Sequence, residues 1–344
     1  MSNGAHSASV ARQGPPAAAE YLHIGGELAG QRIDNFLLTR LKGVPRSHLY
    51  RVLRRGEVRV NKGRVRPSYR LREGDLVRVP PLRVGEAPPE VQPSQGELTR
   101  LRQAILFEDD RLIAVDKPAG LAVHGGSGLS YGVIEAMRRL RPDLGDLELV
   151  HRLDRETSGC LLLAKRRSAL RALHAALRAS EVDKRYLALL VGPLPRREVA
   201  VDVPLRKNLL RSGERVVRVD PVEGKPARSV FRRLRQIGDL SLVEVELLTG
   251  RTHQIRVHAA HLGTPIAGDD KYGDAAANRR LRAVGLKRLF LHAAALTIPR
   301  EGRPLRIEAP LPGELAVVLA ALDAEQGLTA LQSRKGQQSA NERK

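Results

Sequence analysis

The nine residues HRLDRETSG, at positions 151–159 of this 344-residue chain, form a polar run between two apolar ones. Residues 148–150 precede the run and residues 160–163 follow it, and both predict buried strands. A polar loop held between buried strands is rigid, which suits a carboxylate that reacts. Asp154 is therefore a candidate catalytic group. The spacing fits equally well a structural loop carboxylate paired with a neighbouring arginine.

Outward from this loop, strands and helices follow one another irregularly. We expect strands at residues 106–115 (two, around a turn), 147–151, 160–164, 186–191, 229–234, 242–247, 289–298 and 305–307. We expect helices at residues 131–140, from Ser168, at 252–261 and from Glu314. Without a regular βα repeat, this order favours an α+β fold with a mixed, mainly antiparallel sheet over a doubly wound parallel sheet. The domain so defined spans residues 101–325.

A smaller module is expected before that domain, at residues 29–80, with two short helices followed by strands that end in a hairpin. The Pro-rich residues 81–100 predict a linker. The composition of residues 1–20 predicts a disordered tail, and residues 330–344 predict a flexible polar tail.

The small module carries a concentrated positive charge. Residues 31–80 hold 14 Lys or Arg against 4 Asp or Glu, so their net charge of +10 is nearly half of the chain's +21. Five cations share the second helix and the hairpin: Arg51, Arg54, Arg55, Arg59 and Lys62. A dense cationic face on a compact module is suited to binding phosphates, which makes nucleic acid the leading partner. The alternative is a solvated face of unrelated basic residues.

Composition argues against several other classes of protein. The single cysteine, Cys160, excludes an intrachain disulfide framework and a multi-Cys zinc site, which fits a reducing cytosol. No run of about 18 apolar residues predicts a transmembrane helix, and residues 1–19 lack the apolar core of a signal peptide. We therefore expect a cytoplasmic protein with no membrane partner. Ser158 lies outside a Gly-x-Ser-x-Gly elbow, which argues against a serine hydrolase.

Four runs together resemble one enzyme family. Besides residues 151–159, these are Asp183–Ala188, Thr249–His258 and Asp116–Gly120, in the expected order across about residues 105–310. They are similar to the pseudouridine synthases of the type-A family, which act on ribosomal and transfer RNA. Residues 127–135 and the basic module resemble most the synthase-C subgroup, which implies large-subunit (23S) ribosomal RNA as substrate. The module itself resembles the small RNA-binding domain first known from ribosomal protein S4.

The resemblance implies a role for each residue of the site. Asp154 would be the nucleophile, either attacking the ribose anomeric carbon or removing a proton to give a glycal, and the sequence leaves both open. Arg256 would keep Asp154 ionised. Tyr186 would stack on the detached uracil and help to remove its C5 proton, unless it is only a core residue of its strand. Arg152 would fill the space left by the flipped base. Lys184 and Arg251 would contact phosphate or brace the loop.

The reaction implied by the resemblance needs no cofactor, because it involves no net redox change or hydrolysis. No metal site is expected either, because His253, His258 and His261 match no zinc motif and Arg251 and Arg256 would repel a cation. We expect a monomer, since no apolar stripe is left over. Two alternatives stay open: a family member that acts on uridines of other ribosomal or transfer RNA, and a ribosome-binding protein without catalytic activity.

Overall fold

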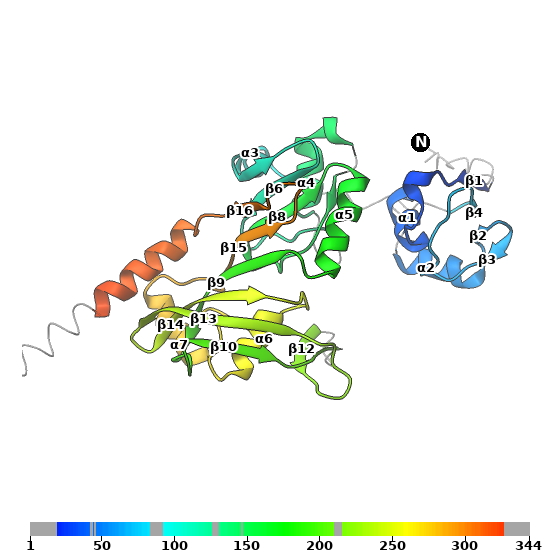
Figure 1. Cartoon of the computed structure of the whole chain (residues 1–344). Coiled ribbons are helices and arrows are strands. Elements are labelled where there is room, and N and C mark those ends of the chain that lie inside the picture. Colours follow the sequence, from blue (N-terminus) through cyan, green and yellow to red (C-terminus); the bar gives the residue numbers. More distant parts are fainter. Residues whose placement is uncertain are drawn as a thin grey trace, which may run out of the picture. The chain divides into compact units, whose positions relative to one another are not determined.

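The computed structural model describes residues 19–41, 44, 46–82, 92–125, 131–145, 147–209 and 215–326 (Figure 1). The chain divides into two compact units, Met1–Glu90 and Val91–Lys344. Among the helices described, none is long and apolar enough to cross a membrane.

The first unit packs two helices against a small antiparallel sheet. Its elements are β1 (Glu20–His23), α1 (Ile33–Arg40), α2 (Arg46–Arg55), β2 (Arg59–Val60), β3 (Gly63–Arg64) and β4 (Leu76–Val79). The strands lie in the order β1-β4-β2-β3. Side chains from both helices, such as Leu37 and Leu49, share one apolar core with Val60 and Val77 of the sheet. The charged faces of the helices are thereby left toward solvent.

The second unit is built on one ten-stranded sheet with the path β10-β13-β14-β9-β15-β8-β6-β5, while β16 pairs with β15 and β7 with β8. The strands are β5 (Ile105–Glu108), β6 (Leu112–Lys117), β7 (Glu148–Leu149), β8 (Ser158–Ala164), β9 (Asp183–Val191), β10 (Glu198–Asp202), β13 (Arg228–Ile237), β14 (Leu240–Leu247), β15 (Leu291–Ile298) and β16 (Leu305–Glu308). A separate hairpin joins β11 (Leu205–Leu209) to β12 (Arg215–Val219).

Strands β8 and β15 form a parallel pair, whereas every other pairing described is antiparallel. The pair is short, with His292 opposite Ser158 and Ala293 opposite Gly159. Gly159 has a φ of +110°, and a Cβ there would lie 2.2 Å from the Ala293 carbonyl oxygen. Only glycine fits this position, because both the backbone conformation and the close approach exclude a side chain.

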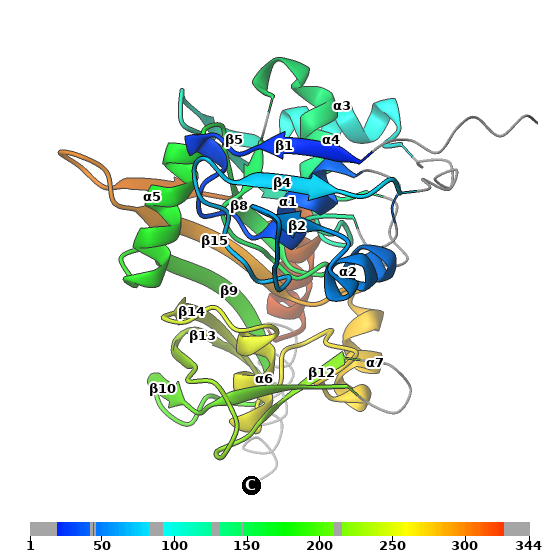
Figure 2. The ribbon, with the colours of Figure 1, turned by 90° about the vertical axis from the view of Figure 1, so that its right-hand side faces the viewer.

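Helices cover both faces of the sheet (Figures 1 and 2). The helices are α3 (Gln95–Gln103), α4 (Val133–Leu140), α5 (Arg167–Arg178), α6 (Gln254–His261) and α7 (Ala275–Ala283), with a further helix at residues 313–326. Alternate residues of β8 point to opposite faces: Leu161 joins the cluster of α3, α4 and α6, and Leu162 joins that of α5 and β16. Because both faces of β8 are buried, the loop before it starts from a rigid base.

The predicted α+β class with a mainly antiparallel sheet is confirmed, and so is the small N-terminal α/β module. Several elements differ from the expectation. Helix α3 begins at Gln95, inside the range assigned to a linker, where Ser94 and Glu97 form a capping box. Helix α6 begins at Gln254, because the residue before it, His253, is left-handed with a φ of 53°. The β11–β12 hairpin and α7 were not anticipated.

Candidate active site

Asp154 begins a tight turn between β7 and β8. The Thr157 N–H donates to the Asp154 carbonyl at 3.1 Å, which closes a four-residue turn. The Asp154 side chain is about one quarter exposed, while Thr157 and Ser158 behind it are buried. The candidate carboxylate therefore meets solvent from a backbone anchored in the core.

A buried lysine holds this turn from behind. Lys117, at the end of β6, is fully buried, and its ammonium donates to the carbonyls of Pro118 and Leu121 at 2.8 Å and of Arg155 at 3.0 Å. Burial lowers the pKa of Lys117 to about 7. Three carbonyl acceptors match the three ammonium protons, so the lysine fixes the backbone one residue after Asp154.

Buried Ser158 follows the turn directly and anchors its C-terminal end. Ser158 Oγ accepts a hydrogen bond from Arg288 Nη2 at 2.7 Å and lies 2.9 Å from His292 Nδ1. Strand β15 thus binds the loop through a side chain as well as through the parallel backbone pair.

Arg256, the expected cation, faces Asp154. Its Nη1 lies 4.0 Å from Asp154 Oδ2, at ion-pair distance. Its Nε and Nη2 donate to the two carboxylate oxygens of Asp269 at 2.7 Å each. Burial would raise the pKa of Asp269, but the hydrogen bonds and the charge of Arg256 outweigh it and hold that pKa below 3.8. The bidentate pair orients the guanidinium toward Asp154.

His253 is a second neighbour of Asp154. Its Nε2 lies 4.0 Å from Asp154 Oδ2, and its Nδ1 lies 2.8 Å from the Tyr272 hydroxyl. Burial lowers the pKa of His253, although the charge of Asp154 acts in the opposite direction. The imidazole is therefore neutral at neutral pH.

Tyr186 lies on β9 and is 7% exposed. It lines a cavity of about 90 Å³ together with Asp154, Arg256 and His253. Burial raises the pKa of its phenol, and the nearby Asp154 charge adds to that shift. The structure thus brings the three predicted catalytic residues to one cavity from a loop, a strand and a helix.

The other predicted contacts of the site divide into two groups. Arg152 and Arg251 are exposed and line the same cavity as Asp154. Arg152 also lines an adjoining cavity of about 710 Å³, which extends to Lys207 on the β11–β12 hairpin. Lys184 lines neither cavity. Burial lowers the pKa of Lys184. The positive charge of Lys184 adds to the effect of burial in lowering the pKa of His151, at the start of the loop.

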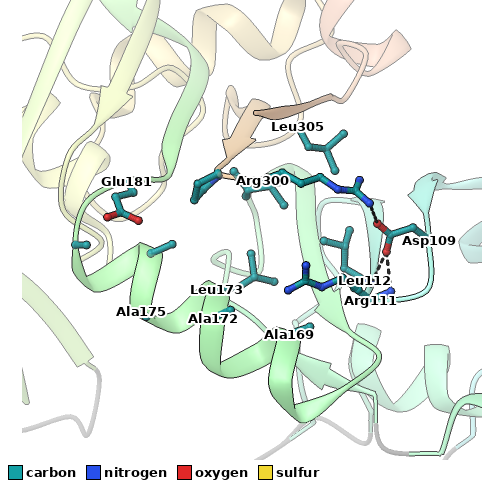
Figure 3. Close-up of a pocket in the computed structure, with 14 residues that line it drawn as sticks. Asp109, Arg111, Leu112, Ala169, Ala172, Leu173, Ala175, Glu181, Arg300 and Leu305 are labelled. Atoms are coloured by element: carbon teal, nitrogen blue, oxygen red, sulfur yellow. Dashed lines mark hydrogen bonds and ion pairs between the residues drawn. The ribbon is translucent and has the colours of Figure 1, made fainter. Parts of the chain in front are cut away.

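Another hollow, of about 260 Å³, lies far from this chemistry (Figure 3). Alanines of α5 line it, and Arg300 pairs with Asp109 at 3.1 Å on its rim. Leu112 lines this hollow and pairs with Ala164. Ala164 lies at the end of β8 that is far from the Asp154 turn. Six residues of strand separate the two ends, about 20 Å at 3.3 Å per residue. This hollow is therefore not part of the Asp154 site.

The five predicted cations of the small module are exposed: Arg51, Arg54, Arg55, Arg59 and Lys62. Arg54 and Arg59 use Nε to donate to the backbone carbonyls of Tyr50 and Gly56 at 3.2 Å. Such bonds orient the side chains without neutralising their charge. Of the five, Arg55 also lies at ion-pair distance from a carboxylate, 3.9 Å from Glu57 Oε1. The module thus presents a cationic surface.

Sequence analysis missed four residues that build the site. Lys117 lies in a motif quoted for the family resemblance, but no role was predicted for it. His253 was weighed only as a metal ligand, and among the described residues no group of three or more His, Cys, Asp or Glu could hold a metal ion. Asp269 and Tyr272 carry no local signal beyond the run GDDKYG at residues 268–273. Their role depends on contacts with α6, which spacing does not reveal.

Comparison with known proteins matches both units. Residues 111–261 match the family model of RNA pseudouridylate synthases, and residues 31–77 match that of the S4 domain. The chain is 55% identical over 307 residues to ribosomal large subunit pseudouridine synthase C of Yersinia pestis, covering 88% of this chain and 95% of that protein. It is 55% identical over 293 residues to the protein of the same name from Escherichia coli K12, covering 84% and 92%.

Solved structures agree with this similarity. The chain superposes on human RNA pseudouridylate synthase domain containing 4 with a TM-score of 0.55 and 28% identity, covering 65% of this chain and 95% of that one. Human RNA pseudouridylate synthase domain containing 1 gives a TM-score of 0.51 and 27% identity, covering 61% and 83%.

Proposed function

This chain belongs to the RNA pseudouridine synthase family, and from that premise we propose that it isomerises specific uridines to pseudouridine in large-subunit ribosomal RNA. The observation that carries the proposal is the meeting of Asp154, Tyr186 and Arg256 at one cavity. The relatives named for the large ribosomal subunit, at 55% identity over most of the chain, support the choice of RNA.

The reaction breaks the bond between ribose C1′ and uracil N1, turns the base, and joins C1′ to uracil C5. The proton on C5 leaves and a proton is gained at N1, so atoms and electrons balance without a cofactor. Asp154 is proposed as the nucleophile, and Arg256 Nη1 faces its carboxylate from 4.0 Å. A cation fixed by Asp269 needs no reorganisation during the reaction, which favours catalysis.

Tyr186 is proposed to stack on the detached uracil. Its ring is buried beside Asp154, so a base released there meets an aromatic surface. Because its pKa is raised, the phenol is protonated at neutral pH and can exchange a proton with the C5 position only as a neutral donor and acceptor.

A uridine inside a folded RNA reaches Asp154 only if it leaves its stack. Arg152 is exposed on the rim of both cavities and is proposed to occupy the space that the base vacates. Arg251, on the rim of the smaller cavity, is proposed to contact phosphate. Lys184, whose charge acts on His151 at the start of the loop, is proposed to brace the loop. The cationic surface of the module at residues 29–80 is proposed to bind RNA outside the site, through Arg51, Arg54, Arg55, Arg59 and Lys62.

The proposal is tested by incubating the purified chain, without added metal or nucleotide, with unmodified large-subunit RNA and mapping pseudouridine. We expect new pseudouridines with the native protein and none above background with Asp154→Asn. Transfer RNA and small-subunit RNA serve as parallel substrates. Activity on those RNAs alone would refute the substrate, normal turnover by Asp154→Asn would refute the mechanism, and binding without turnover would indicate a non-catalytic ribosome-binding protein.

A further inference from the structure

Tyr272 occupies a junction between the β11–β12 hairpin and the two side chains that face Asp154. Its hydroxyl accepts a hydrogen bond from the Val217 N–H of β12 at 2.9 Å and lies 2.8 Å from His253 Nδ1. Its ring lies under the guanidinium of Arg256, with 5.0 Å between Cζ and the ring centroid. One side chain therefore touches the hairpin, the imidazole and the guanidinium.

The hydroxyl determines which nitrogen of His253 carries the proton. A phenol has one proton, and the Tyr272 oxygen already accepts from Val217, so the arrangement that uses this proton is donation to His253 Nδ1. A neutral imidazole that accepts at Nδ1 carries its own proton on Nε2. Nε2 is the atom that lies 4.0 Å from Asp154 Oδ2, so an N–H rather than a lone pair faces the carboxylate.

His253 has an unfavourable backbone conformation that its surroundings hold in place. Its φ of 53° lies in the left-handed region, which costs a residue other than glycine free energy. Buried Gln254 holds the segment in place: its Nε2 donates to the Arg228 carbonyl and to Ser229 Oγ at 2.9 Å, and its Oε1 accepts from the Arg251 N–H at 3.0 Å. Strain maintained by such a network is typical of a site where orientation matters.

We propose that Tyr272 is a positioning residue that fixes the Nε2–H tautomer of His253 and aims this N–H at Asp154. The ring of Tyr272 also supports Arg256, so both donors around the proposed nucleophile depend on one side chain. Since Val217 lies on the hairpin that walls the larger cavity, the position of the hairpin is transmitted to these donors. This inference rests on the proposed role of Asp154.

The variant that isolates the hydroxyl is Tyr272→Phe, which keeps the ring under Arg256 and removes both hydrogen bonds. Its matched control is Tyr131→Phe, which removes the hydroxyl bond from Tyr131 to the Glu97 carboxylate in the same unit. We expect kcat to fall about tenfold in Tyr272→Phe with KM for RNA within about twofold, and neither to change in Tyr131→Phe. If the two variants lost the same fraction of kcat and the same amount of Tm, the loss of rate would be due to lower stability, and the proposal would be overturned.

Acid pH should reduce the defect. In Tyr272→Phe the neutral imidazole is free to turn a lone pair toward Asp154, whereas protonation restores an N–H at Nε2. The charged groups around His253 include Asp154 on the turn, Arg256 on α6, and Asp269 and Lys271 before α7. Arg152 and Arg251 line the smaller cavity with it, and Lys207 lies on the hairpin wall of the larger one. All of them are common to both proteins, so the ratio of variant to native kcat should rise as pH is lowered from neutral and His253 becomes protonated. A ratio independent of pH would contradict the tautomer argument.

Two further measurements do not depend on the pH profile. In ¹⁵N-histidine-labelled protein, with His253 assigned by comparison with His253→Gln, Nδ1 should give an unprotonated signal that changes in Tyr272→Phe. A protonated Nδ1 in the native protein would overturn the proposal even if Tyr272→Phe did not fold, and it would leave the role of Asp154 untouched. In a His253→Gln background, Tyr272→Phe should lower kcat less than twofold, because the two changes remove one interaction. Full additivity would show that Tyr272 acts elsewhere.

Discussion

Arg256 binds Asp269 through Nε and Nη2, at 2.7 Å each, and thereby leaves Nη1 to face Asp154 at 4.0 Å. The carboxylate that is fully buried fixes the guanidinium, and the carboxylate that is open to solvent is the proposed nucleophile. One arginine thus contacts both a buried structural aspartate and the proposed nucleophile.

Asp269→Asn should lower kcat by about a hundredfold, because displacement of a catalytic group by about 1 Å has that effect. The dependence of protein stability on acid pH should change as well. The pKa of Asp269 is lowered in the folded state, so its contribution is present above pH 3.8 and is lost as pH falls through the lower folded value. Tm of the native protein should therefore fall more steeply below pH 4 than Tm of the variant. Parallel curves would show that the pair adds no pH-dependent stability.

Lys117→Met should destabilise the chain by about 3 kcal/mol, since three carbonyls lose a hydrogen bond from the ammonium at about 1 kcal/mol each. Lys165→Met is the control, because that lysine is less completely buried and bonds the Glu108 carboxylate and the Asp109 carbonyl, away from the Asp154 turn. Denaturant unfolding measures both free energies. If Lys117→Met were no less stable than the control, the three carbonyls would not depend on the ammonium.

Gly159→Ala should cost about 3 kcal/mol or more, because the new Cβ meets the Ala293 backbone in a conformation that already disfavours a side chain. Gly145→Ala is matched to it: φ there is +56° and nothing lies within 4 Å of the new Cβ. We expect the control to lose only about 1–2 kcal/mol. The difference in free energy of unfolding measures the contact between β8 and β15, and equal losses would mean that the strands can move apart freely.

Tyr186→Phe and Tyr186→Leu separate the ring from the hydroxyl. The Phe variant should bind substrate RNA normally and turn over about tenfold more slowly, from loss of the proposed proton exchange. The Leu variant should lose a further tenfold or more, since stacking of a base on an aromatic ring contributes about 1–3 kcal/mol. Single-turnover rates with saturating enzyme compare the three proteins. Equal rates for Phe and Leu would argue that no base stacks on Tyr186.

The triple variant Arg51→Gln, Arg54→Gln, Arg55→Gln should weaken RNA binding and flatten its salt dependence. Each lost phosphate contact reduces the log–log slope by about 0.9 on duplex. The charge-matched control replaces three exposed arginines of the second unit: Arg235, Arg280 and Arg306. Binding is measured between low and physiological salt. A slope that changes equally in both variants would reflect net charge rather than the helix α2 surface.

The sequence predicted the enzyme family correctly, because residues 151–159 and the runs around Tyr186 and Arg256 are distinctive over a large part of the chain. It also predicted that these three residues would meet, and they do. It did not predict Asp269, Tyr272 or His253 as neighbours of Asp154, because their contacts join α6, the segment before α7 and the β11–β12 hairpin. Local periodicity carries no information on such long-range pairs.

The short parallel pairing of β8 with β15 has a consequence for the order of synthesis. His292 comes 134 residues after its partner Ser158 in the chain. The strand that holds the Asp154 turn is therefore synthesised long after the turn itself. A growing chain that already contains every residue of HRLDRETSG still lacks the neighbour that fixes Asp154. The proposed site therefore cannot assemble until β15 has been synthesised as well.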